Sequence, residues 1–132
     1  MCFPHNRPRV RPIRPLYANK SNPSIYSRHI RHLAESCVAA VFNVSFYEMR
    51  SSQRCCTDVA FARQIAMYLA HVAGSLSLSE VGRLFGRDHT TVAYACAAVE
   101  DRRDDPLFDR CLAFLEVGLV ACAPREDRGG AR

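Results

Sequence analysis

The sequence predicts an all-α fold, a compact bundle of about five to six helices that includes a helix-turn-helix. Apolar residues recur every three to four positions through most of the stretch from 27 to 121, which is the period of an amphipathic helix. A length of 132 residues with 48% hydrophobic content provides one core flanked by tails. We therefore expect a basic arm over residues 1–26, one helical domain over residues 27–121 and a tail over residues 122–132, with both ends disordered.

Residues 76–95 contain two helix starts within a dozen positions. Ser77 can cap the first helix by accepting from the backbone N–H three residues later, and Glu80 at that position can reach back. Gly86 suits the left-handed geometry that ends a helix, and Asp88 can cap the next one. Two helices joined across a three-residue turn have the spacing of a helix-turn-helix.

In a DNA-binding helix-turn-helix the second helix enters the major groove with its amino-terminal residues against the base edges. Here those residues are Arg87, Asp88, His89, Thr90 and Thr91. Arginine and histidine can donate to phosphate or guanine, aspartate can accept from cytosine, and the threonine methyl can contact the thymine methyl. The alternative is that the aspartate only caps the helix and the threonines only fill a solvated first turn, since short helical hairpins without DNA are common.

The remaining helices follow from the same reasoning. They are expected over residues 27–42, 46–49 and 59–73 and from Pro106 onward, and the second helix of the helix-turn-helix is expected to extend to about Arg103. In the first helix, the spacing places Arg28, Arg31, His32 and Glu35 on the solvent side.

The helix over residues 59–73 is apolar around most of its circumference, so we expect it to be the central and most buried one. Thr57 or Asp58 can cap it and Gly74 can end it. Asp105 can cap the last helix, with Pro106 at its first position. The apolar stripe of that last helix is expected to comprise Leu107, Phe108, Cys111, Leu112, Leu115 and Leu119.

Positive charge is concentrated at the amino end. Residues 1–32 hold seven of the eighteen Lys and Arg residues and none of the thirteen acidic ones, so the rest of the chain carries a net charge of −2. The proline- and arginine-rich arm, which includes Arg7–Pro15, has no helical or strand period. Beside a helix-turn-helix it can follow phosphates or enter a minor groove, or it can be a solvated tail.

Several classes of function are not expected. The seven cysteines include no C-x-x-C pair, and Cys37, Cys96 and Cys111 fall on apolar helix faces, so buried thiols are favoured over a metal site or disulfides. The five histidines have no catalytic partner at useful spacing, and no phosphate-binding G-x-x-x-x-G-K-[ST] motif is present. No stretch has the length of a membrane span or the pattern of a signal peptide. We therefore expect a cytoplasmic, nucleoid-associated protein that is not an enzyme and needs no cofactor.

Three blocks of the sequence carry a resemblance to a known family. Q-I-A-M-Y-L-A at Gln64–Ala70, L-S-L-S-E-V-G at Leu76–Gly82 and F-G-R-D-H-T-T-V at Phe85–Val92 resemble the C-terminal DNA-binding domain of the bacterial replication initiator DnaA. The resemblance covers roughly Arg31 to Glu116. It implies an all-helical fold of the Trp repressor-like class and double-stranded DNA as the partner, read as a nine-base-pair box through the second helix and a basic loop.

The resemblance also implies roles for individual residues. Arg87 would contact phosphate, the four residues after it would meet bases, and Leu78 with Ser79 would approach the groove from the preceding helix. The basic loop corresponds to residues 50–56 and the positions just after it. The DNA-binding residues expected on this basis are Arg50, Arg54, Arg63, Leu78, Ser79, Arg87, Asp88, His89, Thr90 and Thr91.

Two features depart from the family pattern. Phe61 occupies the position of the minor-groove arginine, where its ring cannot replace a guanidinium although it could act as a wedge, and Gly86 stands alone where many initiators have two glycines. The ATP-driven assembly of the initiators needs a separate nucleotide-binding domain, and we do not expect 132 residues to hold one. The sequence thus predicts a stand-alone, sequence-specific DNA-binding protein that regulates replication initiation or transcription and meets the proteins of those processes. The alternative is a protein-interaction module that has lost box-specific binding.

Overall fold

The computed structural model describes residues 25–50 and 57–124. Within these ranges the chain forms six helices and no strand, which confirms the predicted all-α fold. The expectations about residues 1–24 of the basic arm, Arg54 and the end of the tail concern positions outside the described residues. Ile25 and Tyr26, which were assigned to the arm, form the start of the first helix. The helices are α1 (Ile25–Phe42), α2 (Phe46–Arg50), α3 (Thr57–Val72), α4 (Leu78–Phe85), α5 (His89–Arg102) and α6 (Pro106–Cys122).

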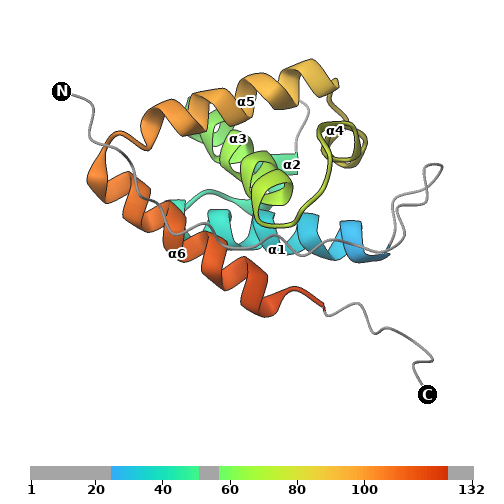
Figure 1. Ribbon diagram of the computed structural model, residues 1–132, viewed down its shortest axis with the longest axis horizontal. Coiled ribbons are helices and arrows are strands. Elements are labelled where there is room, and N and C mark those ends of the chain that lie inside the picture. The colour runs from blue at the N-terminus through green and yellow to red at the C-terminus, as the bar shows by residue number, and fades with distance from the viewer. Residues whose placement is uncertain (1–24, 51–56, 125–132) are drawn as a thin grey trace.

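Helix α3 lies at the centre of the molecule, as its sequence predicted. It packs against α1 on one side and α5 on another, while α6 crosses α1 obliquely and α4 lies beside α5 (Figure 1). Its six successive residues from Ile65 to Ala70 are all buried. A helix that is apolar around most of its circumference has to be covered on several sides, and here α1, α5 and α6 provide that cover.

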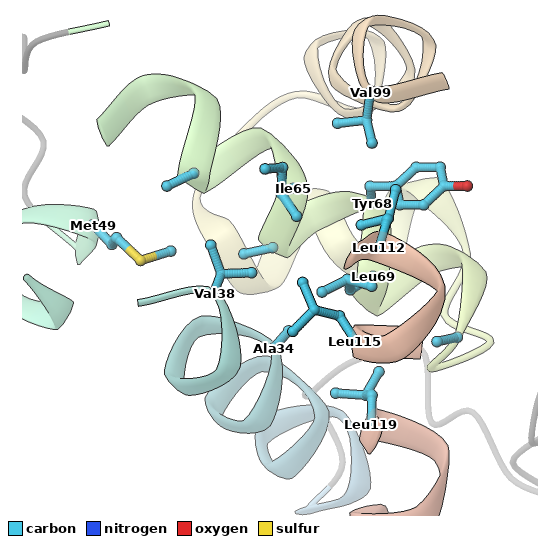
Figure 2. Close-up of a cluster of buried hydrophobic side chains, with 13 residues drawn as sticks. Ala34, Val38, Met49, Ile65, Tyr68, Leu69, Val99, Leu112, Leu115 and Leu119 are labelled. Atoms are coloured by element: carbon cyan, nitrogen blue, oxygen red, sulfur yellow. The ribbon is translucent and has the colours of Figure 1, made fainter. Parts of the chain in front are cut away.

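The larger of two apolar clusters joins α3 to α1, α5 and α6. Ile65 and Leu69 from α3 meet Val38 from α1, Val99 from α5 and Leu119 from α6, and all five side chains are fully buried (Figure 2). Side chains from four helices therefore share one close-packed interior, in which the removal of a few methyl groups leaves a cavity.

The smaller cluster fixes the helix-turn-helix to the rest of the domain. Val81 and Val92, one from each helix of the motif, pack with Ile30 of α1 and Met67 of α3. Ala123, just beyond α6, belongs to this cluster as well, so the beginning of α1 and the end of α6 lie on the same side of the domain (Figure 1). The two helices of the motif thus have a fixed orientation relative to the central helix.

A buried polar network closes the far end of α5. Arg103, 4% exposed, forms ion pairs with Asp109 and with the buried Glu116 of α6, and donates to the Tyr68 hydroxyl at 2.9 Å. That hydroxyl donates in turn to Glu100 at 2.6 Å. Desolvation by burial raises the pKa of Tyr68, and the hydrogen bond to the Glu100 carboxylate raises it further. Because the charges are paired, the buried arginine is tolerated between the apolar helices.

Four local expectations were wrong. Glu35 is buried rather than on the solvent side, because two arginines pair with it. Leu107 is 75% exposed rather than part of the inner stripe of α6, because it lies in the first turn, before that helix reaches the core. At the end of α3 the left-handed residue is Ser75 (φ 61°), not Gly74. Thr57 lies inside α3 as its first residue and does not precede the helix.

The cause of the difference at Gly74 is a close approach. A Cβ there would lie 2.4 Å from Cγ2 of Ile30 and 2.6 Å from the carbonyl oxygen of Ala70. The Gly74 carbonyl also accepts from the Tyr26 hydroxyl at 3.1 Å. Glycine is needed at this position for space, whereas the reversal of the chain direction takes place one residue later.

The cysteines of the described segments are unpaired. Cys37, Cys96 and Cys111 are partly buried on apolar helix faces, and Cys122 is exposed. Burial raises the pKa of Cys96 to about 11. Over residues 25–50 and 57–124 no group of His, Cys, Asp or Glu side chains is arranged to hold a metal ion. Among the same residues, no helix combines the length and the apolar character that crossing a bilayer requires.

Replacement of Ile65 by alanine should lower the free energy of unfolding by about 2–5 kcal/mol, because it leaves a cavity among α1, α3 and α5. Urea denaturation monitored by circular dichroism measures this change. The matched control is Val117→Ala on the outer face of α6, where the side chain is 55% exposed; its effect should stay within about 0.5 kcal/mol. Equal losses for the two variants would contradict the central position of α3.

The thiols should differ in reactivity at pH 8. Because the pKa of Cys96 is raised to about 11, only a small fraction of this thiol is ionised, and iodoacetamide should alkylate it at least roughly tenfold more slowly than the exposed Cys122. Peptide mass spectrometry of the folded protein measures both rates. The difference should narrow as the pH is raised toward 11, and equal rates at pH 8 would show that Cys96 is not held in an apolar environment.

Candidate nucleic-acid interface

Helix α4 begins with the predicted capping box. The Ser77 hydroxyl accepts from the backbone N–H of Glu80 at 3.1 Å, and the Glu80 carboxylate accepts from the backbone N–H of Ser77 at 3.0 Å. Val81 and Leu84 are buried on the inner face, while Arg83 lies exposed on the outer one. The short helix is therefore fixed at its start by hydrogen bonds and along its length by burial.

The turn between α4 and α5 is closed by two glycines with different roles. Gly86 has the left-handed conformation (φ 66°), as predicted, and its N–H donates to the carbonyl oxygen of Gly82. The N–H of Arg87 donates to the same oxygen at 2.8 Å. A Cβ at Gly82 would lie 2.6 Å from the Arg87 carbonyl oxygen, so only glycine permits this close approach. The role of Gly82 was not foreseen from the sequence, although a glycine inside a short amphipathic helix indicates a packing requirement.

Helix α5 places its amino end outward. Val92, Ala95 and Val99 bury one face of the helix against α3 and α4. On the other side, the five residues of greatest interest are all exposed: Arg87, Asp88, His89, Thr90 and Thr91. The unpaired N–H groups and the positive end of the helix dipole lie at the same place, which favours an anionic partner there.

Asp88 occupies the N-cap position with extended backbone geometry (φ −69°, ψ 148°), but its side chain makes no capping hydrogen bond. One carboxylate oxygen lies 3.2 Å from Nδ1 of His89 instead, with both side chains about two thirds exposed. The prediction that the carboxylate caps the helix was therefore wrong. As a result, both side chains face solvent at the start of α5.

The two candidates from the preceding helix lie at the start of α4. Ser79 is exposed and Leu78 is partly buried, where it contacts the smaller apolar cluster. Both sit on the first turn of α4, immediately after the capping residue Ser77. Ser79 is therefore accessible to a partner that also contacts the start of α5, whereas Leu78 is accessible only in part.

Two of the arginines expected in or just after the basic loop, Arg50 and Arg63, have partners within the protein. Arg63 donates through Nε to the Met49 carbonyl oxygen at 2.9 Å and through Nη2 to the Glu48 carbonyl oxygen at 3.3 Å, so it joins α3 to α2. Arg50, at the end of α2, donates to Glu35 at 2.8 Å and its guanidinium stacks 4.7 Å from the Phe46 ring centroid. Phosphate contacts by these arginines therefore depend on donors that remain after the internal bonds are made.

Phe61 does not extend into solvent as a free ring. Its centroid lies 5.7 Å from that of Phe108 on α6, and the Arg102 guanidinium lies 4.7 Å from the ring. Partly buried in this way, the ring packs against the larger apolar cluster. The phenylalanine that stands in place of the family's arginine therefore packs inside the protein, where α3, α5 and α6 meet.

A capped helix, a three-residue turn and a second helix with an exposed polar amino end together define a helix-turn-helix domain. The family described as "Bacterial dnaA protein helix-turn-helix" matches residues 34–99, from the middle of α1 to near the end of α5. The chain belongs to this family, which confirms the resemblance seen in the three sequence blocks.

Individual relatives agree with this assignment. The chain is 43% identical over 89 residues to the chromosomal replication initiator protein DnaA 2 of Chlamydia trachomatis, covering 67% of this chain and 19% of that protein. It is 38% identical over 85 residues to the chromosomal replication initiator protein DnaA of Thermoanaerobacter sp. strain X514, covering 64% of this chain and 19% of the relative. The chain thus spans about a fifth of the length of the curated relatives it matches.

The fold has a solved counterpart. The crystal structure of a DNA replication initiation factor superimposes with a TM-score of 0.65 at 32% sequence identity. The match covers 75% of this chain and 30% of that one. The helical arrangement predicted from the resemblance is therefore confirmed.

Replacement of Gly82 by alanine should destabilise the domain by about 1–3 kcal/mol, because the new methyl group collides with the Arg87 carbonyl at the turn. The matched control is Gly118→Ala in α6, where a Cβ would meet nothing within 4 Å. There, the higher helix propensity of alanine should stabilise the protein by up to about 1 kcal/mol. Urea midpoints measure both changes, and the two variants should shift in opposite directions; destabilisation of the same size in both would contradict the close approach.

Proposed function

We propose that this chain binds double-stranded DNA in a sequence-specific manner through the amino end of α5, and that it acts in the regulation of replication initiation or transcription. One observation carries the proposal. All five residues from Arg87 to Thr91 are exposed at the amino end of α5, and the opposite face of this helix is fixed in the core. The expected setting is the bacterial cytoplasm, on the nucleoid. Family membership supports the proposal, because the relatives are named as replication initiators.

In the proposed complex the amino end of α5 lies in the major groove. Arg87 binds a phosphate with its guanidinium, while His89, Thr90 and Thr91 contact base edges. Asp88 accepts from a cytosine amino group; its carboxylate does not cap the helix and stays about two thirds exposed beside His89. The positive end of the α5 dipole strengthens the contact with the DNA backbone.

Residues outside α5 provide orientation and affinity in this proposal. Leu78 and Ser79 meet the groove from the first turn of α4. The phosphates of the DNA backbone are contacted by Arg50, Arg54 and Arg63. Since residues 33–132 carry a net charge of −2, the basic residues of the amino-terminal arm provide much of the phosphate neutralisation. Binding should therefore weaken steeply as the salt concentration rises.

The proposal is tested by selecting bound duplexes from a random pool and measuring dissociation constants by fluorescence anisotropy. Arg87→Ala should weaken binding to all sequences and reduce the salt slope by about one. His89→Ala and Thr91→Ala should each relax the preference at one base pair, at a cost of roughly 1–3 kcal/mol for the preferred site. Arg110→Ala, an exposed cation on α6, is the matched control and should leave the preference unchanged.

Equal losses on all duplexes for His89→Ala and Thr91→Ala would contradict the assignment of base-reading roles. A wild-type chain that binds no duplex better than random DNA would instead support a protein-interaction module. Deletion of residues 1–24 separates the two functions further, because it should reduce DNA affinity without affecting binding to a protein partner.

A further inference from the structure

Glu35 is an acidic residue buried inside an otherwise apolar part of α1. Its neighbour Ala34 and the residue one turn later, Val38, belong to the larger apolar cluster, and Glu35 itself is only 1% exposed. Each of its carboxylate oxygens has a separate cation. Oε1 pairs with Nε of Arg31, one turn earlier on α1, and Oε2 accepts from Nε of Arg50 on α2 at 2.8 Å.

The first of these cations extends to the helix-turn-helix. Nη1 of Arg31 donates to the carbonyl oxygen of Leu84, and its guanidinium lies 5.0 Å from the ring centroid of Phe85. These are the last two residues of α4, immediately before Gly86 and the turn. The final carbonyls of a helix lack partners within the helix and carry its negative dipole end, so a guanidinium is well suited to hold them.

The second cation holds the other candidate DNA-contacting segment. Arg50 is the last residue of α2, directly before residues 51–56, and its guanidinium is stacked on Phe46 of the same helix. From the side of α3, Arg63 binds the Glu48 and Met49 carbonyls of α2. Helix α2 is thus fixed from both neighbours. Its contacts with α1 are the ion pair of Arg50 with Glu35 and a ring contact of Phe46 with His32, whose centroids are 5.5 Å apart.

We propose that Glu35 is a positioning residue for DNA binding: one buried carboxylate fixes, through Arg31 and Arg50, the turn before α5 and the end of α2 relative to each other. This inference rests on the proposed function. A buried ion pair is a poor source of fold stability, because apolar residues of similar volume often serve as well or better. What the carboxylate adds is geometry, since its two oxygens join elements from two places in the sequence to α1.

The same arrangement predicts that loss of the Glu35 charge strengthens binding to random DNA, whereas a folding defect would weaken it. The Glu35 carboxylate neutralises guanidinium charge on Arg31 and Arg50, with which it forms ion pairs. Loss of its charge raises the net charge of the chain by one and releases both cations toward DNA phosphates. Binding to random duplexes should then tighten and its salt slope should become steeper, whereas discrimination between sequences should decrease.

The test compares Glu35→Gln with wild type in the full chain, using the selected duplex and a scrambled duplex at several salt concentrations. The ratio of the dissociation constant for the scrambled duplex to that for the selected duplex should fall by about 2- to 30-fold, the range for coupling through a side-chain network. Binding to the scrambled duplex should tighten, with a salt slope steeper by about one. The matched control is Glu116→Gln, which neutralises another buried, arginine-paired carboxylate at the far end of α5; its ratio and slope should stay at the wild-type values.

An unchanged ratio for Glu35→Gln, or an equal decrease for Glu116→Gln, would overturn the inference. If circular dichroism shows that Glu35→Gln does not fold, Arg31→Lys replaces it, because one ammonium keeps the charge but cannot bind the Glu35 carboxylate and the Leu84 carbonyl as a guanidinium does. That variant should lower the ratio and leave the salt slope unchanged; a wild-type ratio would overturn the inference. A wild-type chain that binds no duplex is a separate result, since it contradicts the proposed function itself.

Discussion

The burial of α3 on opposite faces is the constraint on which the rest of the domain depends. Ile65 and Leu69 lie in the cluster shared with α1, α5 and α6, while Met67 and Ala70 lie in the one shared with the helix-turn-helix. Since one rigid helix serves both clusters, the position of α4 and α5 is set by the same element that orders α1 and α6. The exposed amino end of α5 is therefore held by the whole interior of the domain.

This construction separates support from recognition on one helix. The inner residues of α5 are small or β-branched and pack against α3 and α4, whereas its first turn carries polar side chains that face solvent. Discrimination between base pairs requires side chains that start from a fixed backbone. Glu35 adds to this support through its two arginines. Arg31 binds the end of α4, just before the turn, and Arg50 is the last residue of α2.

Local chemistry predicted much of this structure. The Ser77–Glu80 capping box, the left-handed Gly86 and the start of α6 at Pro106 all depend on residues a few positions apart, and the structure has each of them. The burial of Glu35 and the lost capping role of Asp88 could not be predicted in this way. The burial of Glu35 depends on Arg50, a cation from another helix, and a helical period does not show such a partner. The Asp88 carboxylate lies against the adjacent His89 instead of capping the helix, and the spacing of the residues does not distinguish these two arrangements.

The positions of the two ends of the helical domain have a practical consequence. Ala123 shares a cluster with Tyr26 and Ile30, so the chain enters and leaves on one side of the domain. Domains of this kind tolerate insertion and circular permutation, because joining neighbouring ends disturbs no packed element. This bundle is therefore suited to being appended to or inserted within a larger polypeptide, which would join it beside the cluster that supports the helix-turn-helix.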